Sequence, residues 1–184
     1  RDQFRSFQDQ YQIMPEWVAE FSAMGQTALD APPGKFTRYE AFFRHSGFRL
    51  PTTNFLVEVL VTYGVHITQM SPYGVLRVMH FEMTCRALGV DPNFNRFNVL
   101  YAQELATGGW YSFNPRKGVP EVATNSPKSM RDWNECFFFV HMGVIPIVMP
   151  WLLMGEKMKI KSFPVMKGFE KERWFMALTA HPTR

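Results

Sequence analysis

The residues of this chain that could do chemistry on a substrate are first of all its acids. Phosphoryl transfer with two metal ions needs three carboxylates held in one place. Local sequence explains three of the acids without chemistry: Glu40 as a helix-capping residue, Asp91 as a helix start, and Glu58 on a solvent-facing helix surface. No local pattern predicts a catalytic set among the candidates, which are Asp30, Glu40, Glu58, Glu82, Asp91, Glu104, Glu121, Asp132 and Glu135.

Histidine and cysteine form no metal-ligand or nucleophile pattern either. His80 comes two residues before Glu82, so the two could form an acid/base pair, but a packed histidine is the simpler interpretation and a nucleophile is missing. Cys85 and Cys136 stand far apart, which predicts neither a zinc site nor a disulfide framework and fits a reducing intracellular compartment. Because glycine-rich phosphate-binding motifs are also missing, we expect no enzyme, no cofactor and no metal.

Two aromatic islands, residues 108–117 and 132–140, stand close together in the sequence. In the first island, rings stand beside basic groups, a pattern that can bind single-stranded RNA, although a buried aromatic core with solvated charges at a turn is the simpler interpretation. A lysine-rich stretch near the C-terminus could contact phosphates or form a solvated surface. The residues predicted to bind nucleic acid are Trp110, Tyr111, Phe113, Arg116, Lys117, Lys157, Lys159 and Lys161.

Local start and stop signals predict four helices that position these groups. Thr37 and Glu40 have capping-box spacing, and Ser71 is an N-cap candidate followed by proline at the first helical position. Glycines close three of the helices. The expected helices run from Thr37 to about His45 with a stop at Gly47, from Leu50-Pro51-Thr52 to Gly64, from Ser71-Pro72 to Gly89, and from Asp91-Pro92, with an apolar face that includes Tyr101, to a break at Gly108-Gly109.

The rest of the chain predicts strands and less regular segments. Aromatic and β-branched runs favour strands, and Pro15 should interrupt any helix near the N-terminus. The expected strands are 110–113, 119–124 and 136–140; a helical turn is expected at 128–134, partly helical structure at 3–23, and a terminal helix at 170–178.

These elements predict an α+β fold, a mainly helical single domain with a small antiparallel β-sheet built from the two aromatic islands. Residues 1–151 would form the domain, with 1–33 less strongly patterned. Residues 152–184 would form a basic, loosely patterned and truncated C-terminal extension. The chain opens at Arg1 without a methionine, so it looks like a piece of a longer polypeptide.

The order of the motifs is more specific than any one of them. The series includes Tyr39-Glu40-Ala41-Phe42-Phe43, Ser46-Gly47-Phe48-Arg49-Leu50-Pro51, Tyr63-Gly64-Val65-His66-Ile67-Thr68-Gln69, His80-Phe81-Glu82-Met83, Gly109-Trp110-Tyr111-Ser112-Phe113 and Trp133-Asn134-Glu135-Cys136-Phe137-Phe138. From roughly Tyr11 to Trp151 this series resembles the plant domain family of gypsy-type transposons, also labelled a transposase of gypsy type. The resemblance implies a gag-like, retroelement-derived module and transfers no catalytic residue.

Three functions remain open at this point. The first is a non-catalytic structural or protein-interaction module that self-associates or binds other proteins of the element. The second is a nucleic-acid-binding module for RNA or DNA. The third, a true transposase or nuclease, requires acids such as Glu82, Asp91, Asp132 and Glu135 to gather in space. We expect an intracellular protein, in the cytoplasm or nucleus, with no membrane partner, because no apolar run reaches the ~18 residues of a membrane span.

Overall fold

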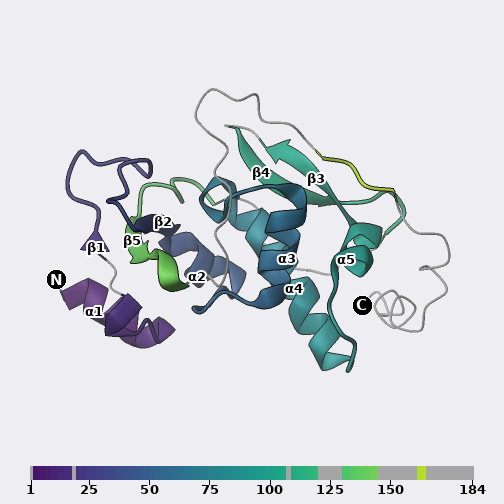
Figure 1. Cartoon of the computed structure of the whole chain (residues 1–184), viewed down its shortest axis with the longest axis horizontal. Coiled ribbons are helices and arrows are strands. Elements are labelled where there is room, and N and C mark those ends of the chain that lie inside the picture. The colour runs from purple at the N-terminus through teal and green to yellow at the C-terminus, as the bar shows by residue number, and fades with distance from the viewer. Residues whose placement is uncertain (1, 18–19, 107–108, 120–129, 145–160, 165–184) are drawn as a thin grey trace.

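The computed structural model describes residues 2–17, 20–106, 109–119, 130–144 and 161–164 (Figure 1). In this part of the chain lie the α-helices α1 (Asp2–Tyr11), α2 (Glu40–Ser46), α3 (Asn54–Tyr63), α4 (Pro72–Ala87) and α5 (Phe94–Leu100). The strands are β1 (Glu20–Phe21), β2 (Lys35–Tyr39), β3 (Tyr101–Ala106), β4 (Trp110–Pro115) and β5 (Phe137–His141). The short 3-10 helices are η1 (Pro15–Trp17), η2 (Ile67–Gln69) and η3 (Met142–Val144).

The strands form two antiparallel sheets, one of three strands in the order β1-β5-β2 and one of two strands, β3-β4. The predicted α+β class, mainly helical with small antiparallel pairing, is confirmed. The predicted single sheet from both aromatic islands is wrong, because the first island lies in β4 and the second in β5, which belong to different sheets.

The molecule therefore has two regions (Figure 1). The three-stranded region holds β1, β5 and β2 with α1 and α2, and the hairpin region holds β3 and β4 with α3, α4 and α5. They are joined where α2 packs against α4, with the Ser46 hydroxyl donating a hydrogen bond to the carbonyl oxygen of Pro72 at 2.9 Å. One continuous cluster of buried apolar side chains extends through both regions.

Local signals explain where the central helices begin and end. Ser71 caps α4 by accepting a hydrogen bond from the amide of Gly74, as predicted, and Thr53 caps α3 in the same way. Gly47 and Gly64 end α2 and α3 in the left-handed conformation, both at φ 67°, as predicted. The predicted start of α5 at Asp91 is wrong, because the Asn93 side chain provides the cap.

The predicted helix start at Thr37 is also wrong. Thr37 lies in β2 and pairs with Phe139 of β5, and its hydroxyl donates to the carbonyl oxygen of Ala28 at 2.5 Å. The helix begins at Glu40, after a Tyr39 N-cap without a side-chain hydrogen bond. A strand partner a hundred residues away thus overrides a favourable local capping pattern.

Strand β3 was expected to be the end of a helix. The helix stops at Leu100, and Tyr101–Ala106 pairs along its length with β4. The predicted strand at 119–124 is not borne out at Val119, which lies outside any strand, and its other residues lie outside the described ones. The predicted terminal helix at 170–178 also lies outside the described residues. A turn precedes β5 at 131–135, where a helical turn was expected.

Candidate functional site

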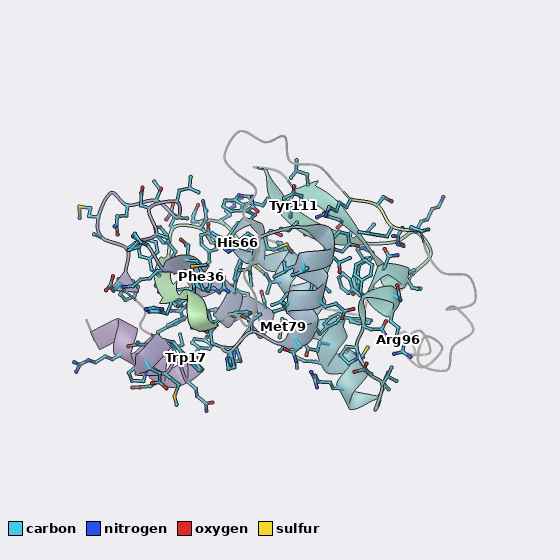
Figure 2. All side chains as sticks on the ribbon, viewed as in Figure 1. Trp17, Phe36, His66, Met79, Arg96 and Tyr111 are labelled. Carbon is cyan, nitrogen blue, oxygen red and sulfur yellow. The ribbon has the colours of Figure 1, made fainter. Side chains whose placement is uncertain are left out.

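The aromatic residues predicted to bind nucleic acid face the interior of the hairpin region. Tyr111 (labelled in Figure 2) and Phe113 are fully buried, which fits the interpretation of a buried aromatic core and does not favour stacking of their rings on bases. Trp110 is half-buried and packs edge-on against Tyr39 and Trp133, with ring centroids 5.8 Å and 4.8 Å apart. These rings hold the hairpin against the helices and connect the two regions.

Arg116, predicted to contact phosphate, is bound by the protein itself. Its Nε donates to the backbone oxygen of Asn98 at 2.6 Å, and its Nη2 donates to the Asn98 side-chain oxygen at 2.8 Å. Nη2 also lies 3.5 Å from the backbone oxygen of Phe163. Because a guanidinium presents its donors in a fixed fork, these contacts place Asn98 and Phe163 relative to the end of β4.

Lys161 also contacts the protein rather than solvent alone. Its backbone amide donates to the Gln103 side-chain oxygen at 2.7 Å, and its Nζ lies 3.4 Å from the carbonyl oxygen of Thr62 near the C-terminal end of α3. That position suits a cation, because the last carbonyls of a helix carry partial negative charge. Gly64 makes room for it, since a Cβ there would lie 2.7 Å from Nζ.

The four residues Lys161–Pro164, which we call the docked segment, run beside β3 and toward α5; they are the yellow-green stretch in Figure 1. Phe163 packs its ring edge-on against Tyr63 and Phe94, with centroid distances of 5.3 Å and 5.0 Å. Asn98 Nδ2 donates to the backbone oxygen of Pro164 at 3.1 Å and lies 3.5 Å from that of Phe163. Part of the predicted C-terminal extension therefore packs onto the same core.

We call the surface that receives this segment the segment groove, and it has a polar side and an aromatic side. The polar side chains are Asn98, Gln103 and Arg116, and the aromatic ones are Tyr63 and Phe94. Burial raises the pKa of Tyr63 to about 12, against the opposing effect of the Arg116 charge, so its phenol stays neutral. The groove binds backbone groups through amides and a guanidinium and takes one aromatic side chain.

Gln103 is unusual within this groove. Its side chain is 6% exposed, and its oxygen accepts from the Lys161 amide. Its Nε2 donor has no hydrogen-bond acceptor among the described residues. Buried donors are nearly always satisfied in native proteins, so this one marks a position where a further carbonyl would be stabilised.

Among the remaining predicted nucleic-acid residues, the structure describes Lys117. Lys117 is exposed in the turn after β4, and Lys157 and Lys159 lie outside the described residues. Arg77, on α4, is engaged by the hairpin: its Nη1 donates to the Phe113 carbonyl and, at 2.9 Å, to the Asn114 side-chain oxygen.

The possible acid/base pair of His80 and Glu82 is not formed. Glu82 is buried, pairs with Arg86 at 2.6 Å and accepts from the Thr53 hydroxyl at 2.7 Å. Burial lowers the pKa of His80. Within the described ranges, no group of three or more His, Cys, Asp or Glu side chains is arranged to hold a metal ion. No helix in the described part is long and apolar enough to cross a membrane.

Arg38, on β2 of the three-stranded region, is fully buried without an ionic partner in the described part of the chain. Its Nε and Nη2 have no hydrogen-bond acceptor, and Nη1 makes only a 3.4 Å contact to its neighbour Thr37. The guanidinium lies 3.9 Å from the ring centre of Phe36. Burial lowers the pKa of Arg38 well below its usual value. Burial and the Arg38 charge together lower the pKa of His66 to about 3.

An open hollow of about 730 Å³ lies at the outer side of the three-stranded region, between α1, β1, α2 and the start of β5. Its lining combines the rings of Phe7 and Phe21 with the Glu40–Arg44 ion pair, whose atoms are 2.9 Å apart. Cys136, an exposed free thiol, lies at its edge. The hollow lies in the three-stranded region, whereas the segment groove lies in the hairpin region.

One family known from other proteins covers the middle of this chain. Residues 39–104 match the family described as "Putative gypsy type transposon". The match runs from Tyr39 through most of β3, so it includes Tyr63, Phe94, Asn98 and Gln103 of the segment groove. No curated protein and no solved structure matches the chain.

Sequence reasoning missed Asn98 and Gln103 of the groove and Phe163 of the docked segment. Asn98 and Gln103 are single polar residues in apolar surroundings, a signal that could have marked them as buried hydrogen-bonding groups. Phe163 is a ring within a lysine-rich stretch, which was interpreted by its charge alone.

Proposed function

We propose that this chain is a non-catalytic protein-interaction module of a gypsy-type transposon-related protein. One observation carries the proposal: the segment groove binds an extended stretch of chain through its backbone carbonyls, its amide and one aromatic side chain. Contacts of this kind are how proteins recognise extended peptides, because backbone hydrogen bonds supply affinity and a side-chain pocket supplies specificity. The family match of residues 39–104 supports the transposon context.

The arrangement of the described acids and cations supports the same proposal. Glu82 and Glu40 each pair with an arginine of their own helix. Arg116 and Arg77 bind backbone and amide oxygens of the hairpin region. Charges that are used in this way stabilise the scaffold and are not presented to a substrate.

Nucleic-acid binding is the second candidate, and exposed Lys117 favours it. Lys117 follows the hairpin in a turn and has no hydrogen-bond or ion-pair partner among the described residues. A phosphate contact at such a position would raise affinity for any sequence and would weaken with salt. The two candidates therefore predict different responses to ionic strength.

The test compares self-association with nucleic-acid binding on the same chain. Sedimentation velocity from low to high protein concentration should show concentration-dependent association that persists in moderate salt. A titration with labelled single-stranded RNA and with duplex DNA at low salt should show no saturable binding. A chain that is monomeric throughout and binds RNA or DNA, with affinity that falls steeply with salt, would contradict the proposal and support the alternative.

A further inference from the structure

The groove contacts the docked segment in the way that a protein contacts a bound peptide. Lys161–Pro164 belongs to no helix and no strand. Its polar contacts come from side chains of the groove to its own backbone: Gln103 to the Lys161 amide, Asn98 to the Pro164 carbonyl, and Arg116 near the Phe163 carbonyl. Phe163 is half-buried against two rings. Such contacts depend on the segment's own four residues and not on how they are connected to the rest of the chain.

The unsatisfied amide of Gln103 adds a second observation. A primary amide can accept from a backbone N–H through its oxygen and donate to a backbone carbonyl of a neighbouring peptide unit through its nitrogen. Gln103 makes the first of these bonds, to Lys161, and its Nε2 lacks the second within the described residues. Leaving a buried donor without an acceptor is unfavourable, because its lost hydration is not replaced. The groove therefore offers one buried donor that the segment does not use in its present position.

The identity of a bound segment follows from what already fits the groove. The sequence Lys-Ser-Phe-Pro provides an aromatic side chain for the Tyr63 and Phe94 pocket, a cation for the end of α3, and a proline that favours extended backbone in the preceding residue. Every copy of the chain carries this segment. The 16 residues 145–160 separate it from η3 in sequence, and at ~3.3–3.6 Å per residue a stretch of that length can reach a neighbouring molecule.

We infer that the segment groove of one copy binds residues 161–164 of a second copy, so that two copies associate by exchanging this segment. The inference rests on the proposed interaction function and names its partner. Exchange preserves the contacts made within one chain. A reciprocal exchange between two copies forms a closed dimer, because each copy provides one segment and binds one. The segment of a second copy therefore competes with the chain's own segment. Association increases as the protein concentration approaches the effective concentration of the segment at the groove of its own chain.

The decisive experiment uses one variant that damages the segment and one that damages the groove. Phe163→Ala removes the ring but leaves the groove intact, and Asn98→Leu removes the donor to the segment but leaves the segment intact. The unaltered chain should form a dimer at high concentration, and each variant alone should stay monomeric. An equal mixture should recover dimers, because the Asn98→Leu copy can place its intact segment in the intact groove of the Phe163→Ala copy.

A peptide titration provides the second readout. A labelled synthetic peptide of residues 159–166 should bind the Phe163→Ala chain, and Asn98→Leu in that chain should weaken this binding by about tenfold or more. An excess of unlabelled peptide should dissociate dimers of the unaltered chain. This last measurement also decides the question if Phe163→Ala proves too unstable to assay.

Each contrary outcome identifies what has failed. Dimers that both variants and the peptide leave intact would overturn segment exchange while leaving the interaction function standing. A peptide that binds a chain which never dimerises would overturn the second copy as the occupant of the groove. A monomer that binds no peptide but binds RNA would overturn the proposed function itself.

Discussion

One arginine in each of the two regions of this protein shows how differently the regions accommodate this side chain. In the hairpin region, Arg116 donates to the backbone and side chain of Asn98 and reaches the docked segment. In the three-stranded region, Arg38 is fully buried with two nitrogens unsatisfied in the described part of the chain, over the ring of Phe36. Arg116 holds Asn98 in place through hydrogen bonds, whereas Arg38 is buried with little hydrogen bonding in the described part of the chain.

This difference shows that an arginine is not by itself a sign of a binding site. A buried cation stabilises a fold when oxygens surround it, and otherwise it carries a desolvation penalty that packing must offset. Both arginines stand near aromatic residues in the sequence, and only the structure separates their roles. The predictions below test that separation, from the largest expected effect to the smallest.

Removing the ring that joins the two regions should have the largest effect. Trp133 packs against Tyr39 of the three-stranded region and Trp110 of the hairpin region, with both centroid distances at 4.8 Å. We expect Trp133→Ala to lower the free energy of unfolding by about 3 kcal/mol, the lower end for such core truncations because Trp133 is half-buried. Met24→Ala, at a fully exposed side chain, is the matched control and should change it by less than ~0.5 kcal/mol. An unchanged melting temperature for Trp133→Ala would show that the regions do not depend on this contact.

Replacing Arg116 should be the next most damaging change. Arg116→Met deletes the donors to both Asn98 oxygens and leaves these buried acceptors unsatisfied, so we expect a loss of about 2–3 kcal/mol in the free energy of unfolding. Urea denaturation would measure it as a lower midpoint with an unchanged slope. If stability is unaffected, Arg116 is not a structural residue and its availability for nucleic acid has to be reconsidered.

The same substitution in the other region should have the opposite sign. Arg38→Met replaces a buried, unpaired cation with an apolar side chain of similar length, so we expect the free energy of unfolding to rise by about 1–2 kcal/mol. The stacking on Phe36 that is lost is worth less than the desolvation that is relieved. The urea midpoints of the two arginine variants should therefore lie on opposite sides of that of the unaltered chain. A loss in both would remove the contrast between the regions.

Acid should weaken the fold through His66, which lies between α3 and η2 and packs its ring edge-on against Phe36 of β2. Its pKa falls from 6.5 to about 3 in the folded protein, so the unfolded chain binds a proton between these values when the folded chain does not. Stability from this group is complete above pH 6.5 and falls by about 1.4 kcal/mol per pH unit below it. His66→Asn keeps an N-cap acceptor for the Thr68 amide and should flatten this acid limb. The lowered pKa of His80 acts with the same sign in both proteins, so it cancels in the comparison.

Sequence patterns predicted the central helices because their signals are local. Ser71 with Pro72, and the glycines at 47 and 64, act within a few residues, and the structure confirms each of them. The patterns failed where distant chain decides the outcome. Thr37 was predicted to cap a helix, but it lies in a strand and pairs with Phe139. Tyr101 was predicted to lie in a helix, but it lies in a strand and pairs with Pro115.

The candidate site was predictable only in part for the same reason. Arg116 and Lys161 were chosen for their charge, and the structure brings both to one place. Local spacing could not predict their partners, because these are distant in the sequence. Arg116 binds Asn98 and approaches Phe163, and the Lys161 amide binds Gln103. Tyr111 and Phe113 were named as candidate stacking rings beside the simpler interpretation of a buried aromatic core, and the structure buries both against the helices.

The account depends most directly on whether Arg116 and Phe163 act together in one groove. A double-mutant cycle with Arg116→Met, Phe163→Ala and the combined variant measures this coupling from urea denaturation. If Arg116 serves the docked segment, the two losses overlap, and the combined variant should be more stable than the sum predicts by about 0.5–1 kcal/mol or more. Losses that add within ~0.3 kcal/mol would contradict the account and leave Arg116 and the segment as unrelated features of the surface.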